Sequence, residues 1–179
     1  DAKQQAEIVA SANWLASGCS IAEKLEQALF VDIGSTTTDL LRIEGNQLQQ
    51  RGNSDFERMR QAELVYTGVV RSCPNTLCTS IPFDGQEMPL VAEQFAVTAD
   101  IYRILEQLPA HADYSSTMDG AEKNQHDSMR RLARMVACDY EDYDATVWRQ
   151  LAQDFASQQR QLIVNAIKQQ LALNPSCET

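Results

Sequence analysis

The stretch A-L-F-V-D-I-G-S-T-T-T-D-L-L-R-I, residues 28–43, places a cluster of small hydroxyl side chains between two apolar runs. The apolar runs are rich in β-branched, aromatic and leucine residues, which is typical of buried strands. The hydroxyl cluster lies between two acids, Asp32 and Asp39, where a buried strand has no use for it. We therefore predict two strands, roughly residues 28–34 and 38–44, joined by a Ser/Thr loop.

This Ser/Thr loop has the composition of a phosphate-binding site. An apolar strand delivers Asp32 to the end of a sheet, where ligands of open α/β proteins tend to bind. Glycine lacks a Cβ atom, so backbone N–H groups beside it can approach an anion closely, and the hydroxyl groups add further donors. The predicted phosphate-binding residues of the loop are Gly34, Ser35, Thr36, Thr37 and Thr38.

The two acids of the loop predict a metal ion. Carboxylates beside a phosphate would repel it unless a cation lies between them. We therefore expect Asp32 and Asp39 to hold Mg²⁺, directly or through water, with the metal bridging to phosphate oxygens. The alternative is a plain β-hairpin whose threonine-rich tip only favours strand formation and leaves Asp39 exposed.

Composition narrows the class of protein. The 179 residues are 44% hydrophobic and 22% charged, as in ordinary globular proteins. A net charge of −10, with scattered lysines and arginines, argues against a nucleic-acid partner. No apolar run approaches the length of a membrane span, so a membrane partner is not expected either.

The cysteines and the first residue bear on location and completeness. The five cysteines form no CxxC pair, which favours free thiols in a reducing cytoplasm over a zinc site. The sequence shows no signal peptide. It also begins at Asp1 without methionine, which predicts a fragment of a longer protein.

Hydrophobic periodicity predicts helices after and before the strand pair. The helical segments are residues 6–28 (with a break at Gly18), 91–108, 127–138 and 145–173. Residues 72–90, which contain three prolines, are predicted to form an ordered loop, and residues 110–126 an irregular one. Strands early and helices late indicate an α/β or α+β fold.

The segment E-L-V-Y-T-G-V-V-R, residues 63–71, is predicted to form a strand punctuated by Gly68, and it holds a second candidate cluster. Glu63 and Tyr66 are predicted catalytic residues, Thr67 and Gly68 line a strand end that faces the phosphate loop, and Arg71 clamps an anion. The alternative is a core strand in which Tyr66 is packed, Gly68 forms a bulge and Arg71 is solvated.

Charged residues of the later helices form a third group. Glu93 and Asp100 are two turns apart on one predicted helix and are candidate acid/base or amine-binding carboxylates. Arg131 and Arg134, with Arg130 beside them, are candidate phosphate ligands. Solvated helix faces and pairing with acids such as Asp127 or Asp139 explain the same pattern. Both tryptophans, at 14 and 148, are interpreted as core residues.

The string V-D-I-G-S-T-T-T-D-L resembles the second phosphate motif of the sugar kinase, actin and heat-shock ATPase superfamily, in particular its hydantoinase/oxoprolinase branch. Further motifs follow at the spacing of a narrower family, and they include A-N-W at 12–14, F-A-V-T-A-D-I-Y-R at 95–103, D-G at 119–120 and R-R-L-A-R-M at 130–135. Together they resemble the tetrahydromethanopterin-linked C1 transfer pathway proteins of methylotrophs and methanogens. That family includes the methanofuran-biosynthesis aryl-ether synthase.

The resemblance implies a ribonuclease-H-like lobe of the actin-like ATPase fold. Residues 1–179 would be the second lobe and central part of a two-lobed protein. The first phosphate loop, of D-I-G-G type, and a glycine loop beyond Thr179 would then be absent from this chain. We expect the isolated chain to be inactive if the site lies between two lobes.

The resemblance also implies a transferase. It would condense an aminomethylfuran methyl diphosphate with γ-glutamyltyramine and release pyrophosphate, with Mg²⁺ as cofactor. The partners would be a small-molecule diphosphate and a phenolic amine, and a homo-oligomer is left open. Two alternatives remain: an ATP-dependent kinase or hydantoinase/oxoprolinase-like amidohydrolase, and a non-catalytic assembly or regulatory lobe.

Overall fold

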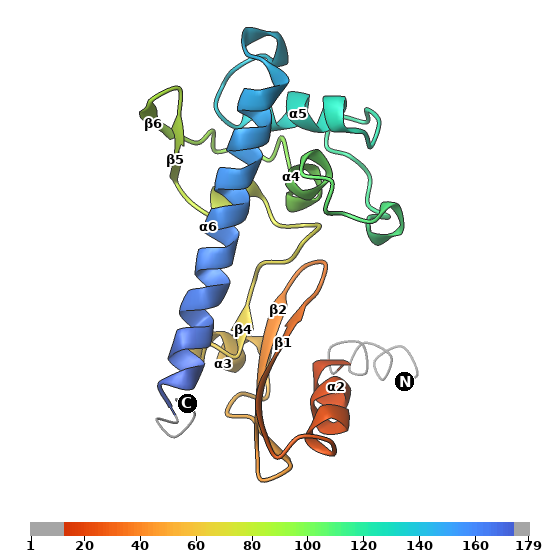
Figure 1. The fold of residues 1–179 in the computed structure, drawn as a ribbon, viewed down its shortest axis with the longest axis vertical. Coiled ribbons are helices and arrows are strands. Elements are labelled where there is room, and N and C mark those ends of the chain that lie inside the picture. The colour runs from red at the N-terminus through yellow and green to blue at the C-terminus, as the bar shows by residue number, and fades with distance from the viewer. Residues whose placement is uncertain (1–12, 174–179) are drawn as a thin grey trace. The chain divides into compact units, whose positions relative to one another are not determined.

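A computed structural model describes residues 13–173 of the chain (Figure 1). These residues form two compact units with separate cores. Unit 1 runs to Val65 and resumes at Val164, and unit 2 is Tyr66–Ile163. The long helix α6, Ala145–Leu171, contributes residues to both units. Among the described helices, none is long and apolar enough to cross a membrane.

Unit 1 is built on an antiparallel sheet centred on β2. Its strands are β1 (Gln27–Ile33), β2 (Thr38–Glu44), β3 (Gln47–Gln49) and β4 (Leu64–Val65). β2 pairs with β1 along its whole length, and β3 and β4 pair with the two ends of β2. Leu40, Leu41 and Ile43 are buried on β2. The two strands predicted around the Ser/Thr loop are therefore confirmed.

Helix α2, Asn13–Ala22, packs beside the β1–β2 hairpin (Figure 1). Gly18 lies inside this helix, so the predicted break there is wrong. A Cβ atom on Gly18 would lie 3.0 Å from a methyl carbon of Leu48. The glycine thus lets the helix approach the sheet closely. The helix ends at Ala22 rather than at residue 28, and residues 6–12 of the prediction lie outside the described part of the chain.

Helix α3, Asp55–Arg60, precedes β4 and was not predicted. The Ser54 side chain caps it by accepting a hydrogen bond from the Glu57 N–H group at 3.3 Å. Gly52 packs against its first turn, and a Cβ atom there would lie 2.5 Å from the Arg58 backbone nitrogen. Only glycine fits at this position without moving the helix.

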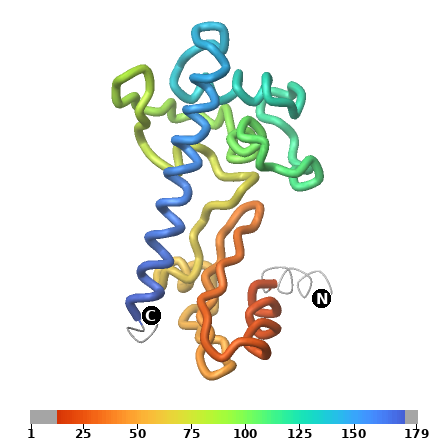
Figure 2. The backbone as a smooth tube through the Cα atoms, viewed as in Figure 1, coloured from red at the N-terminus to blue at the C-terminus, as the bar shows by residue number. Residues whose placement is uncertain are grey.

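Unit 2 is mainly helical, with α4 (Thr98–Ile104), α5 (Gln125–Arg134) and most of α6 around one core. Trp148 is fully buried in that core and stacks on Phe83 with a ring-centroid separation of 5.6 Å. Its interpretation as a core residue is confirmed. Short 3₁₀ turns lie at Pro74–Thr76, Ala110–Ala112 and Tyr140–Asp142. Figure 2 traces the irregular segment between α4 and α5 that the sequence predicted.

The predicted loop at 72–90 contains a hairpin of β5 (Ser80–Phe83) and β6 (Gln86–Pro89). Its turn residues Asp84 and Gly85 have φ angles of 49° and 73°. Positive φ at both central residues is the backbone of a type I′ turn, for which Asp-Gly is a preferred pair. The predicted loop is wrong here, because the Asp-Gly turn allows the two flanking segments to pair even though Pro82 and Pro89 lie within them.

The predicted helix at 91–108 is shorter, because α4 begins only at Thr98. The Val91 N–H group donates to the Met135 carbonyl, which is a contact outside any helix. Asp100 accepts a hydrogen bond from the Val97 N–H group at 3.1 Å and so fixes the start of the helix. Glu93 therefore lies before the helix, and its predicted position on one helix face with Asp100 is wrong. Helices α5 and α6 lie close to where the sequence predicted them.

Candidate functional site

The Ser/Thr loop is the tight turn of the β1–β2 hairpin. The Gly34 N–H group donates to the Thr37 carbonyl at 2.9 Å, so Ser35 and Thr36 form the tip. Asp32 and Asp39 lie directly opposite one another in the strand register. Directly opposed residues of an antiparallel pair have Cβ atoms about 5 Å apart on the same face. The two acids predicted to act together are therefore neighbours.

An open pocket of about 390 Å³ lies beside this turn, wholly within unit 1. Residues from α2, the turn, α3 and β4 line it, and they include Asn13, Trp14, Gly34, Ser35, Thr36, Thr37, Asp39, Asp55 and Arg58. Five of the residues predicted from the sequence are thus gathered around one cavity. The Thr38 side chain is buried and interacts within the protein, so its predicted role as a phosphate ligand is not supported.

Arg58 on α3 is the cation of this pocket, and the sequence analysis missed it. Its Nη1 lies 2.8 Å from Asp39 Oδ1, and its Nη2 donates to the Glu63 carbonyl at 3.1 Å. Its guanidinium carbon lies 3.8 Å above the Trp14 ring centroid, in a cation–π contact. The side chain is only 2% exposed, and its Nε is buried without a hydrogen-bond partner among the described residues. Trp14 is therefore part of the pocket wall rather than of the core.

The charges around Asp39 oppose one another. Burial raises the pKa of Asp39, the hydrogen bond and the charge of Arg58 lower it, and the neighbouring Asp32 and Asp55 carboxylates raise it again. The net shift of the pKa is upward. Two acids, Asp39 and Asp55, thus line the pocket with one arginine, whose charge Asp39 balances. An anion entering the pocket would meet a negative surface unless a cation came with it.

The donor set of the pocket suits a hard cation bound jointly with a phosphate. No group of three or more His, Cys, Asp or Glu within residues 13–173 is arranged to hold a metal alone. Mg²⁺, however, is commonly held by one or two carboxylates together with substrate phosphates and water. Asp39 lines the pocket, although Arg58 already contacts one of its oxygens, and Asp32 lies opposite Asp39 in the strand register without lining the pocket.

Glu63 has a different place from the one predicted. Its carboxylate accepts hydrogen bonds from the N–H groups of Arg51 at 2.8 Å and Gly52 at 3.0 Å, and its side chain is buried. The Arg51 guanidinium lies 3.4 Å away. These contacts fix the loop before α3 and so support Arg58 from behind. A structural role accounts for Glu63, and its catalytic role stays a prediction.

The other residues of that cluster belong to unit 2, because β4 ends at Val65 and the predicted strand at 63–71 does not continue. Thr67 and Gly68 lie in a buried network in which Gln159 Nε2 donates to the Thr67 hydroxyl and the Gly68 carbonyl, both at 2.8 Å. These groups are used inside the protein. Tyr66 and Arg71 are exposed.

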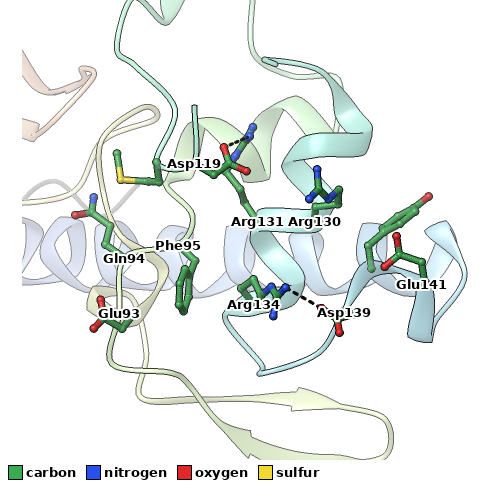
Figure 3. A pocket seen from close by; sticks show the side chains of 11 residues that line it. Glu93, Gln94, Phe95, Asp119, Arg130, Arg131, Arg134, Asp139 and Glu141 are labelled. Carbon is green, nitrogen blue, oxygen red and sulfur yellow. Dashed lines mark hydrogen bonds and ion pairs between the residues drawn. The ribbon is translucent and has the colours of Figure 1, made fainter. Parts of the chain in front are cut away.

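The charged residues of the third group meet at a pocket of about 560 Å³ in unit 2 (Figure 3). Arg131 and Arg134 of α5, with Glu93 from the segment before α4, are among its lining residues. Asp100 lies behind it and binds Arg131 through hydrogen bonds of 2.8 and 2.9 Å. Arg134 pairs with Asp139 at 2.9 Å, as one interpretation of the sequence expected.

A sequence profile described as hydantoinase/oxoprolinase matches residues 1–174. The chain belongs to the hydantoinase/oxoprolinase family. Membership of this family gives the chain the actin-like ATPase fold, in agreement with the early antiparallel sheet and later helices. The family resemblance carried by the Ser/Thr loop is therefore confirmed.

Two curated relatives of this hydantoinase/oxoprolinase family member have the same name, (4-{4-[2-(gamma-L-glutamylamino)ethyl]phenoxymethyl}furan-2-yl)methanamine synthase. The protein from Methanocaldococcus jannaschii is 34% identical over 142 residues, which are 79% of this chain and 43% of that relative. The protein from Methanococcus vannielii is 31% identical over 121 residues, 67% of this chain and 54% of the relative. The chain thus spans about half the length of the curated relatives that it matches.

Proposed function

We propose that this family member supplies the diphosphate-binding site of an enzyme that forms an aryl ether on the path to methanofuran. The observation that carries the proposal is the pocket in which a glycine–hydroxyl turn, the acids Asp39 and Asp55 and a buried arginine meet. Asp32 lies opposite Asp39 in the same hairpin. The name of the two relatives describes a product in which a phenol oxygen is joined to a furan methylene group. A diphosphate on that methylene is a suitable leaving group.

The reaction balances without a redox partner. The phenol oxygen attacks the furan methylene carbon, the bond from that carbon to the diphosphate oxygen breaks, and the phenol proton passes to a base or to water. The cost of the step lies in the negative charge that collects on the departing diphosphate. This class of reaction is a transfer of an alkyl group with release of pyrophosphate.

Residues of the pocket would act on that charge. Thr36 and Thr37 line the pocket, and their hydroxyls would donate hydrogen bonds to phosphate oxygens. Arg58 balances the charge of Asp39 and so reduces the net negative charge that a diphosphate would meet. Asp32 and Asp39 would hold Mg²⁺, which when bound neutralises diphosphate charge. Gly34 keeps the turn narrow, because its N–H group closes the hairpin rather than binding the anion.

The predicted roles of four other residues remain proposals, because these residues belong to unit 2 and do not line this pocket. Tyr66 and Arg71 are exposed and free to meet a substrate, whereas Thr67 and Gly68 would first have to leave their buried network. A cytoplasmic location and a homo-oligomeric state are two further proposals.

Calorimetric titration of the chain with pyrophosphate, ADP and ATP, each with and without Mg²⁺, tests the function. We expect Mg²⁺-dependent binding of pyrophosphate, with no gain from an added nucleoside. Tighter binding of ATP would instead support a kinase or amidohydrolase of this family. Binding of none of the three would favour a non-catalytic assembly or regulatory role.

Matched variants locate the binding. Asp32→Asn should weaken Mg²⁺-dependent pyrophosphate binding by about tenfold or more, because it removes a carboxylate ligand without changing side-chain size. Glu23→Gln removes a charge from an exposed residue of the same unit that does not line the pocket, and it should bind as the parent chain does. Equal affinity of Asp32→Asn and the parent chain would remove Asp32 from the metal site.

A further inference from the structure

The second pocket, in unit 2, combines a fixed floor with a charged rim. Its volume of about 560 Å³ is within the usual range for small-molecule sites. The residues that line it come from the segment before α4, the loop before α5, α5 itself and the 3₁₀ turn Tyr140–Asp142 (Figure 3). All of them lie within one unit, so the cavity is complete within it.

Arg131 forms the floor and is not available to a ligand. Its side chain is 2% exposed and is bound to Asp100 at 2.8 Å and to Asp119 at 3.0 Å. Burial works against its charge, but the hydrogen bonds and charges of the two acids raise the pKa of Arg131 overall. Ser128 and Arg103 hold Asp100 in turn, at 3.0 and 3.1 Å. This network fixes the floor of the cavity, and its arginines and acids neutralise one another.

Two arginines at the rim are available. Arg130 and Arg134 are four residues apart on α5 and therefore share one face of the helix. Their side chains are 50% and 58% exposed. Arg130 meets Asp127 at 3.4 Å, and Arg134 meets Asp139 at 2.9 Å. Exposed pairs of this kind contribute at most about 1 kcal/mol, so a carboxylate on a ligand can compete for the same guanidinium groups.

Two acids and two apolar side chains complete the rim. Glu93 and Glu141 are exposed, and within the described part of the chain neither has a recorded hydrogen bond or ion pair. Phe95 and Met118 are 39% and 46% exposed, although both are apolar. In Figure 3 Glu93, Gln94 and Phe95 lie on one irregular segment of the chain, across from Arg134 on α5. The rim therefore offers both signs of charge and an apolar surface.

This distribution excludes some ligand classes. Four acids line the cavity against three arginines, and one of those arginines is committed to the floor. A phosphate or another compact anion would thus meet more negative than positive charge. A simple amine has no carboxylate that could pair with the two rim arginines. The lining suits a zwitterion that carries a carboxylate and an ammonium group close together, next to an apolar body.

We propose that this pocket binds the α-amino-acid head group of a γ-glutamyl arylalkylamine. Arg130 and Arg134 take the α-carboxylate, Glu93 takes the α-ammonium group, and Phe95 contacts the apolar part. A γ-glutamyl group attached to an arylethylamine is part of the product that the name of the two relatives describes. The choice of this ligand rests on the proposed function, whereas the preference for a zwitterion rests on the pocket alone.

Calorimetric titration with γ-glutamyltyramine and three analogues tests the assignment. The analogues are tyramine, which lacks the whole head group, 4-aminobutanoyl-tyramine, which lacks the α-carboxylate, and N-acetyl-γ-glutamyltyramine, which lacks the ammonium charge. We expect γ-glutamyltyramine to bind at least about tenfold more tightly than each analogue, since every analogue leaves charged groups of the rim unmatched. Equal binding of tyramine, or no binding of γ-glutamyltyramine at millimolar concentration, would overturn the proposal.

Variants assign each charge to its partner. Arg134→Gln should reduce the affinity for γ-glutamyltyramine several-fold and leave that for 4-aminobutanoyl-tyramine unchanged. Glu93→Gln should reduce the affinity for γ-glutamyltyramine but not for the N-acetyl analogue. Arg149→Gln, a change at an exposed arginine of unit 2 outside this pocket, is the matched control and should have no effect. A loss that is the same for all ligands would contradict the assignment.

Pyrophosphate titrations on the same samples separate this inference from the proposed function. If γ-glutamyltyramine binds as expected and pyrophosphate does not, the second pocket stands and the diphosphate site fails. If pyrophosphate binds and γ-glutamyltyramine does not, the reverse holds. Arg134→Gln should leave pyrophosphate binding unchanged, and a change there would show that both ligands use one site.

Discussion

The pair of Arg58 and Asp39 is the residue contact on which the phosphate pocket depends. Arg58 is nearly fully buried, and Asp39 is its only recorded acidic partner among the described residues. Asp39→Asn leaves a buried guanidinium without its counter-charge, and we expect it to reduce the free energy of unfolding by about 3 kcal/mol. Urea denaturation followed by circular dichroism measures this change.

Asp32→Asn is the control for that change, because it makes the same substitution at the opposite position of the hairpin. Within residues 13–173 Asp32 forms no ion pair with a buried cation, so its replacement should alter the free energy of unfolding by less than about 1 kcal/mol. Equal destabilisation by the two variants would mean that the Arg58–Asp39 contact is not the stabilising one.

Asp119 predicts a dependence of stability on pH. Burial alone would raise its pKa, but the Ala121 N–H group and Arg131 together hold the pKa below the ordinary value of 3.8. A lowered pKa in the folded state stabilises the fold above pH 3.8 and loses that contribution as the pH falls through the folded value. Asp119→Asn should thus be less stable than the parent chain at neutral pH, with the difference shrinking in acid. A difference that grew toward low pH would contradict the assigned contacts.

Sequence reasoning found the acceptors and hydroxyls of the phosphate pocket but missed its cation. The turn from Gly34 to Asp39 is contiguous, so its composition is visible as a motif. Arg58 reaches the turn only because a short capped helix and a tight glycine contact bring it there. A single arginine in a polar stretch has no periodicity or motif spacing from which its contact with the turn could be predicted.

Among the elements, the α3 segment is held in place by a glycine contact. A methyl group on Gly52 would overlap the backbone of α3, at 2.5 Å from the Arg58 nitrogen. The corresponding atom on Gly18 would meet the movable ends of the Leu48 and Leu41 side chains, at 3.0 and 3.2 Å. We expect Gly52→Ala to destabilise the chain by at least about 2 kcal/mol, and Gly18→Ala to stay within about 1 kcal/mol, since helix propensity offsets its crowding.

Thermal unfolding of the two variants checks the order. Gly52→Ala should also weaken pyrophosphate binding, because it displaces the helix that carries Arg58. If Gly18→Ala were the more damaging change, the close approach of α2 to the sheet would be the tighter contact of unit 1.

The hairpin turn makes a further prediction about binding. A side chain on Gly34 would begin with a Cβ atom 3.3 Å from the Thr37 carbonyl oxygen and would strain the turn that presents the hydroxyls. Gly34→Val should therefore abolish pyrophosphate binding more completely than Thr37→Ala, which removes one hydrogen bond of about 0.5–1.5 kcal/mol. Greater damage from Thr37→Ala in calorimetry would mean that the hydroxyl outweighs the turn geometry.

The elements that the sequence predicted well are those whose pattern is local. β1 and β2 follow from their apolar runs, and α5 and α6 follow from helical periodicity. The predictions failed where distant contacts decide: the segment before α4 bonds to the Met135 carbonyl instead of continuing the helix. The β5–β6 hairpin is a different case, because its Asp-Gly pair is a local sequence signal that indicates a tight turn.

For the whole molecule, the two proposed sites lie in separate units. Ligand binding slows amide hydrogen exchange chiefly in the cooperative unit that binds. Pyrophosphate with Mg²⁺ should therefore protect amides of β1 and β2, and γ-glutamyltyramine should protect amides of α5. Hydrogen exchange read by mass spectrometry distinguishes the two patterns. Protection of α5 by pyrophosphate would assign the diphosphate to the arginines of the second pocket.

The most direct test is a titration of isotope-labelled chain with pyrophosphate and Mg²⁺, followed by nuclear magnetic resonance. The buried Arg58 Nε–H group, which has no hydrogen-bond partner in the described part of the chain, and the amides from Gly34 to Thr38 report on the pocket itself. We predict saturable shifts of these signals in the parent chain, and none of that size in Asp32→Asn at the same concentrations. Shifts confined to other residues, or an unchanged response in Asp32→Asn, would contradict a diphosphate site at this turn.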